Sequence, residues 1–200
     1  MTGSDTPPGE NQNDETGNTD ANPGAYGTWN RLLLGISAGF ALCYLLTIPL
    51  EAFAGLVFIK GMGVFLLAVV AWNMAARLNA GLNGRLLALA LLLSSLGDVF
   101  LRLDPVGMFV HGLGSFLVAH LIYVGLFLRL RNKAVVDGRQ RAMVALFIIY
   151  GLGLGGWMMP HLGAHMVPVL VYAAVITVMG VTCVLARWGN PWVFIGAVLF

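Results

Sequence analysis

Long apolar stretches follow one another along this chain from residue 31 onward, separated by short polar segments. A transmembrane helix needs about 20 mainly apolar residues. We expect spans over residues 31–50, 53–76, 85–101, 106–130, 142–159 and 165–186. A further apolar run, residues 191–200, is too short to cross a bilayer at about 1.5 Å per residue. The pattern predicts an all-α, polytopic transmembrane helix bundle with six full spans and a partial seventh.

The composition agrees with this pattern. Hydrophobic residues make up 58% of the chain and charged residues only 10%, against roughly 25% charged in soluble domains. Residues 1–28 differ, because they are polar, acidic and rich in Gly, Asn, Asp, Thr and Pro. They lack the basic start and apolar core of a signal peptide. We therefore expect a disordered cytoplasmic tail over residues 1–28 and a helical membrane domain over residues 29–200.

The basic residues gather on one side of the predicted membrane. If the spans alternate in direction, Arg102 lies on one side and Lys60 lies within a span. The other nine basic residues share the opposite side: Arg31, Arg77, Arg85, Arg129, Arg131, Lys133, Arg139, Arg141 and Arg187. The positive-inside rule places that side, and the N-terminus with it, in the cytoplasm. We expect a multi-pass protein of a bacterial inner membrane.

Ionisable side chains within the spans are candidates for a function, since inserting each one at the centre of a membrane helix costs at least ~2.5 kcal/mol. Asp98 stands out because helical spacing places Ser94 and Ser95 on its face. This polar stripe points to an inward-facing cavity or partner. The structural alternative is a pair between Asp98 and Arg102 that anchors the helix end.

His120 is the second candidate. Nine residues at about 100° each place His111 and His120 on opposite faces of one helix. His120 lies deeper and shares its face with Phe116, Tyr123 and Phe127, whereas His111 lies near the outer interface. We therefore expect His120, and not His111, to face a site.

Lys60 and Tyr172 each allow two interpretations. Lys60 lies a short way into the second span, where it either extends outward to the interface or pairs with Glu51 or Asp98. Tyr172 follows Pro168 by one helical turn and is either an interfacial aromatic or a pocket hydroxyl.

Other chemistry is not visible in the sequence. Cys43 and Cys183 lie in apolar stretches without metal-binding spacing, and we interpret both as small buried hydrophobic residues. The chain has no Gly-x-Ser-x-Gly motif and no P-loop. We expect no metal and no cofactor.

One region resembles a known family. The segment 93–101 reads LSSLGDVFL, with Gly97 and Asp98 near the end of a span, and the segment 109–127 reads FVHGLGSFLVAHLIYVGLF. Their order and spacing resemble the YhhN-like family of membrane proteins, whose animal members are lysoplasmalogenases. Lys60 stands where that family has Lys-Pro, although Gly61 replaces the proline here, and the segment 167–172 is similar to a later Tyr-containing span.

The resemblance implies an eight-span fold, of which this chain is the larger part. It implies cleavage of the vinyl ether bond of lysoplasmalogen, a lipid substrate, by carboxylic acid general acid/base chemistry. It also implies a second acidic motif, usually Ser-Asp, after the run at 196–200. We expect Asp98 and His120 to be catalytic. The expected substrate-binding residues are Lys60, Ser95, Arg102, Tyr123 and Tyr172.

Two other functions fit the same residues. A small proton-coupled transporter would use Asp98, His120 and Lys60 as a proton relay, but such proteins often contain internal repeats and this sequence shows no convincing duplication. A noncatalytic membrane protein would use them only for hydrogen bonds between helices. In that case Asn would replace Asp98 without loss.

Overall fold

The computed structural model describes residues 23–47, 55–131 and 136–186. Six α-helices lie within these ranges: α1 (Pro23–Thr47), α2 (Gly55–Arg77), α3 (Gly81–Leu103), α4 (Phe109–Arg129), α5 (Gly138–Met158) and α6 (Met166–Leu185). Two short 3₁₀ turns, η1 (Met159–His161) and η2 (Gly163–His165), join α5 to α6. All six α-helices are long and apolar enough to cross a membrane. The predicted transmembrane helix bundle is confirmed; Glu51 and the run at 191–200 lie outside the described residues.

Three helices begin earlier than their apolar stretches indicate. α1 begins at Pro23, inside the segment expected to be a disordered tail, so residues 23–28 are helical. α5 begins at Gly138 because Asp137 and Gln140 form a capping box, in which Gln140 N donates to Asp137 Oδ1 at 2.7 Å. α3 begins at Gly81, whose φ of 56° favours glycine in the turn after α2. Polar turns thus extend these helices beyond their apolar spans.

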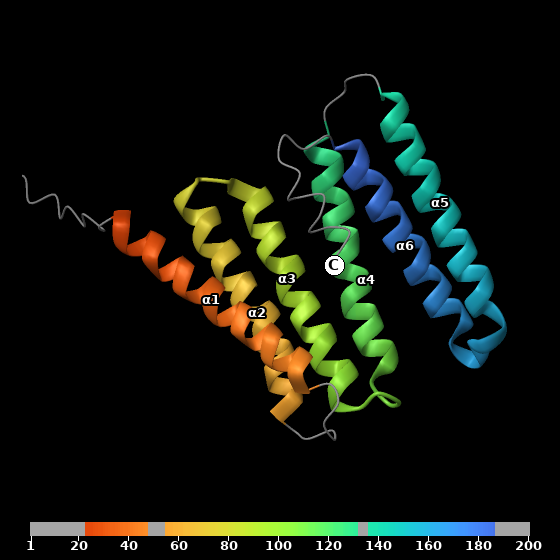
Figure 1. The fold of residues 1–200 in the computed structure, drawn as a ribbon, viewed down its shortest axis with the longest axis horizontal. Coiled ribbons are helices and arrows are strands. Elements are labelled where there is room, and N and C mark those ends of the chain that lie inside the picture. The colour runs from red at the N-terminus through yellow and green to blue at the C-terminus, as the bar shows by residue number, and fades with distance from the viewer. Residues whose placement is uncertain (1–22, 48–54, 132–135, 187–200) are drawn as a thin grey trace, which may run out of the picture.

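The helices do not pack in chain order. α1 contacts α2, α2 contacts α3 and α3 contacts α4, but α4 then contacts α6, and α5 packs on the far side of α6. Figure 1 shows α5 at the edge of the bundle and α6 returning beside α4. This order brings the first turns of α6 against α4, the helix that carries His120.

A buried apolar core joins α3, α4 and α6. Its members are Ala90, Ala119, Tyr123, Leu126, Phe127, Met179, Cys183 and Ala186. Burial of Cys183 agrees with its interpretation as a small buried residue. The same interpretation of Cys43 is wrong, because Cys43 is exposed on α1, which packs mainly against α2 and leaves most of its surface uncovered.

Glycines allow the central helices to approach closely. An added Cβ at Gly61 would lie 2.6 Å from Val99 on α3, and one at Gly97 would lie 2.7 Å from the ring of Phe116 on α4. Residues at these two positions therefore control the spacing of α2, α3 and α4.

The bundle has two chemically different ends. Most basic residues were expected on one side of the membrane. Those of them that the structure describes lie near the end of the bundle where α1 begins. Arg102 lies near the opposite end, where the turn at residues 104–108 joins α3 to α4. We call this opposite end the turn end.

Candidate functional site

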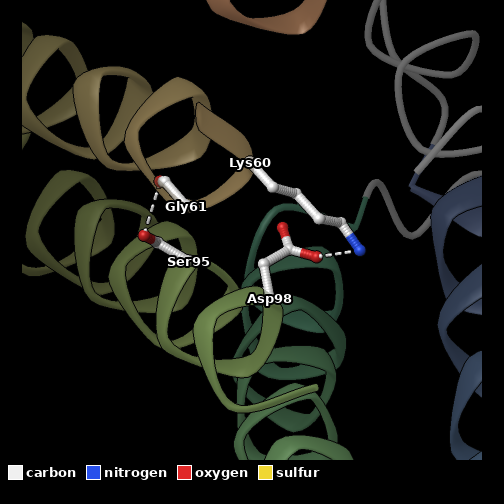
Figure 2. Close-up of polar contacts among 4 residues, drawn as sticks. All are labelled: Lys60, Gly61, Ser95 and Asp98. Carbon is white, nitrogen blue, oxygen red and sulfur yellow. Dashed lines mark hydrogen bonds and ion pairs between the residues drawn. The ribbon is translucent and has the colours of Figure 1, made fainter. Parts of the chain in front are cut away.

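An ion pair joins α2 to α3 near the turn end. Lys60 Nζ lies 2.8 Å from Asp98 Oδ1, as Figure 2 shows. Each residue is five positions from the end of its helix, about 8 Å at 1.5 Å per residue. The Asp98 side chain is 12% exposed and that of Lys60 is 31% exposed. Of the two interpretations left open for Lys60, the structure shows the ion pair, with Asp98 as the partner, and the alternative pair between Asp98 and Arg102 is wrong.

A hydrogen bond between helices supports the ion pair. Ser95 Oγ donates to Gly61 O at 2.7 Å (Figure 2). Gly61 is the neighbour of Lys60, and Ser95 precedes Asp98 by nearly one helical turn. The bond therefore fixes α2 against α3 where the two charges meet. Ser94 Oγ instead donates within its own helix, to Ala90 O at 2.9 Å.

His120 on α4 is nearly fully buried, with 2% of its surface exposed. Its Nδ1 lies 2.6 Å from Phe116 O. Because a carbonyl oxygen only accepts hydrogen bonds, Nδ1 carries the proton, and Nε2 of the neutral ring is an acceptor. His111 is exposed at the start of the same helix. The prediction that the two histidines have different environments is confirmed.

Two tyrosines surround His120. The ring centroid of Tyr172 on α6 lies 5.4 Å from that of His120, with an interplanar angle of 84°. The Tyr123 centroid lies 6.3 Å from it, at 80°. Tyr172 also interacts electrostatically with Asp98, and Tyr123 interacts with Ser94 through its side chain. Tyr172 thus packs against the ring of His120 and is within electrostatic range of Asp98.

The sequence did not point to Tyr44. Lys60 Nζ lies 5.6 Å from the centroid of the Tyr44 ring, within reach of a cation–π contact. A tyrosine near the end of an apolar span carries no sign of its partner on another helix. Five helices thus contribute to a polar cluster, which we define as Tyr44, Lys60, Asp98, His120, Tyr123 and Tyr172.

Two cavities lie on different sides of the contact between α2 and α3. The α1–α2 cavity, of about 320 Å³, is lined by residues of α1 and α2 together with Asp98 on α3, and Lys60 is among them. The Arg102 groove, of about 840 Å³, lies between α2 and α3 and contains Ser95 and Arg102. The structure thus brings Lys60, Asp98, His120, Tyr123 and Tyr172 together. It places the side chains of Ser95 and Arg102 along a separate groove.

The described residues offer few ligands for a metal ion. Within residues 23–47, 55–131 and 136–186, no three His, Cys, Asp or Glu side chains form a group that could hold one. The other described carboxylates have structural partners: Asp104 accepts from Val106 N and Gly107 N, and Asp137 caps α5. Among these residues the chemistry centres on the ion pair, His120 and the tyrosines.

Comparison with known proteins gave two kinds of match. The YhhN family matches over residues 55–200. Two curated proteins named lysoplasmalogenase, from Mycobacterium bovis and Mycobacterium tuberculosis, are each 39% identical to this chain over 123 residues. The match covers 60% of this chain and 47% of each relative, so the chain spans about half the length of these relatives. No solved structure matches.

Proposed function

Because the chain belongs to the YhhN family, we propose that it is a membrane-embedded hydrolase of lysoplasmalogen. It would cleave the vinyl ether bond and release a fatty aldehyde and a glycerophospho head group. The names of the two mycobacterial relatives support this substrate. The observation that carries the proposal is the Lys60–Asp98 ion pair, which lines a mainly apolar cavity and is linked through Tyr172 to the buried His120.

The chemistry requires a proton donor, a negative charge and a base. Hydrolysis of a vinyl ether begins when the β-carbon takes a proton and the ether oxygen shares its lone pair, which gives an oxocarbenium ion. Water then adds to the positive carbon and loses a proton, which gives a hemiacetal. The hemiacetal collapses when its C–O bond to glycerol breaks and the glycerol oxygen takes a proton. The net reaction consumes one water molecule.

We assign the first step to Asp98. In the structure its carboxylate is paired with Lys60. In the proposed complex the substrate phosphate takes the place of Asp98 beside Lys60, and Asp98 then holds a proton. Asp98 gives this proton to the β-carbon, and the resulting carboxylate stabilises the oxocarbenium ion.

We assign the second step to His120. Because Nδ1 is bonded to Phe116 O, Nε2 is the atom that accepts a proton from the attacking water. In this proposal the Tyr172 hydroxyl passes a proton from His120 back to Asp98. Its ring packs against the ring of His120, and it interacts electrostatically with Asp98. Tyr123 and Tyr172 also remain our candidates for substrate contacts. Ser95 and Arg102 have no role in this mechanism because they line the other cavity.

The test is aldehyde release from lysoplasmalogen by the purified full-length protein. We expect Asp98→Asn and His120→Ala to lower the rate by roughly 10²-fold or more, the range of lost general acid–base catalysis. His111→Ala is the matched control, since His111 is exposed on the same helix, and it should retain the wild-type rate. The proposal fails if folded wild-type protein releases no aldehyde, or if Asp98→Asn is fully active.

We also propose an orientation in the membrane. The basic residues near the end of the bundle where α1 begins support a cytoplasmic N-terminus in a bacterial inner membrane. The polar cluster would then lie in the outer half of the bilayer.

A further inference from the structure

The α1–α2 cavity runs along α1 and α2, from the ion pair toward the middle of both helices. At the turn end its lining comprises Tyr44, Leu45, Ile59 and Lys60. At its other end it is bounded by Leu67, seven residues and about 10 Å further along α2. Ser37 Oγ donates to Gly63 O at 2.7 Å and holds α1 against α2 along this length. The cavity is therefore elongated along α1 and α2, and its two charged groups, Lys60 and Asp98, lie at one end.

These features match one hydrocarbon chain with a polar head. A volume of about 320 Å³ is near the low end for ligand pockets, which run from roughly 300 to 1,000 Å³. Away from the ion pair the walls are mainly apolar, with Ala41, Val64 and Leu67 among them. In a lysoplasmalogen the phosphate and the vinyl ether are separated by only the glycerol carbons. The neighbouring groups Lys60 and Asp98 suit that short separation.

The Arg102 groove is the competing location. It is larger, at about 840 Å³, and Arg102 offers a charge for a phosphate. However, neither Lys60 nor Asp98 lines it. The backbone contact at Gly61, where Ser95 donates to Gly61 O, lies between the groove and the ion pair. A chain in the groove would leave the vinyl ether on the wrong side of this contact.

We propose that the α1–α2 cavity holds the single alkenyl chain of the substrate, with the vinyl ether at Lys60–Asp98 and the chain directed toward Leu67. This inference rests on the proposed function and adds to it an orientation and a limit on chain length. The head group faces the turn end, and the aldehyde forms at the polar mouth of the cavity. The walls near Ala41 and Leu67 determine which chain lengths fit.

The first test compares short-chain and long-chain lysoplasmalogens. Ala41→Trp introduces a large ring at the cavity wall, and Ala41 is exposed, so the change does not disturb a packed core. We expect kcat/KM for the long-chain lipid to fall by roughly tenfold or more, because the ring displaces methylene groups from an apolar pocket. The kcat/KM for the short-chain lipid should fall less. Leu42→Trp is the matched control, since Leu42 is 58% exposed and does not line the cavity.

The results separate the two locations. Met62→Trp fills the Arg102 groove instead, and it should leave the chain-length preference unchanged. If Met62→Trp shifts the preference and Ala41→Trp does not, the alkenyl chain binds in the groove and the inference is wrong. An unchanged preference in both variants would also overturn it.

A second test reads binding without turnover. A long-chain lysophospholipid with a photoreactive group at the end of its chain should label Leu67 or Ser37, with the labelled residue identified by peptide fragmentation in the mass spectrometer. Labelling at Met62 or Phe65, which line the groove, would contradict the inference. Labelling in the α1–α2 cavity of a protein that releases no aldehyde would support this cavity as the chain-binding site and contradict the proposed function. The two claims can therefore fail separately.

Discussion

At the residue scale, the pair Lys60–Asp98 places two charges within a helix bundle that is otherwise largely apolar. Ionisable groups are costly in membrane spans, which is why the sequence alone points to Lys60, Asp98 and His120. The sequence does not identify their partners. Helical spacing describes neighbours on one helix, such as Asp98 and Arg102, whereas the ion pair depends on how α2 packs against α3.

The ion pair makes a prediction about stability. Removing one charge leaves the other without its partner, which costs more than removing both. We expect Lys60→Met to destabilise the protein by roughly 1–3 kcal/mol, at the lower end for such pairs because Lys60 is partly exposed. The double variant Lys60→Met/Asp98→Leu should recover part of that loss in thermal unfolding in detergent. A double variant no more stable than Lys60→Met would contradict this account.

At the element scale, the close contact of α3 and α4 determines how the site is assembled. Gly97 precedes Asp98 and packs against Phe116, whose carbonyl oxygen accepts the hydrogen bond from His120. The sequence predicts the six helices from their apolar lengths. The apolar lengths predict the helix ends less well, because α3 and α5 begin in polar turns. For α5 the sequence does contain the Asp137 and Gln140 of the capping box.

Gly97→Ala tests this contact. The added methyl group would lie 2.7 Å from the Phe116 ring and would force α3 and α4 apart, so we expect lower stability and lower aldehyde release. Gly114→Ala on α4 is the control, since an added Cβ there meets nothing within 4 Å. Thermal unfolding and the aldehyde assay measure both effects. Equal thermal stability and equal aldehyde release of the two variants would show that the contact between Gly97 and Phe116 does not determine how the site is assembled.

At the scale of the whole molecule, the order of packing decides which residues meet. α6 lies against α4 and brings Tyr172 to His120, while α5 remains at the edge (Figure 1). Nothing in the apolar pattern distinguishes this order from packing of α4 against α5, because both helices are apolar. The sequence therefore indicates Lys60, Asp98, His120, Tyr123 and Tyr172 as candidates on their own helices. It does not predict which of them meet, and it does not indicate Tyr44.

The proposed orientation predicts opposite accessibility for the two ends of the bundle. In a variant without Cys43 and Cys183, a cysteine at Val106 in the turn after α3 should react with a membrane-impermeant maleimide added to intact spheroplasts. A cysteine at Leu130, which follows α4 at the other end, should react only after permeabilisation. Both positions are exposed, at 84% and 45%, so the reverse pattern would place the N-terminus outside.

The most direct test of the central claim is hydrolysis of lysoplasmalogen in D₂O, with the aldehyde analysed by mass spectrometry. If Asp98 gives a solvent-derived proton to the β-carbon, the wild-type product carries one deuterium on the carbon next to the aldehyde group. Asp98→Asn should form almost none of this product, while His111→Ala should form it at the wild-type rate. Wild-type aldehyde without deuterium at that carbon, or labelled aldehyde formed at the wild-type rate by Asp98→Asn, would contradict the account.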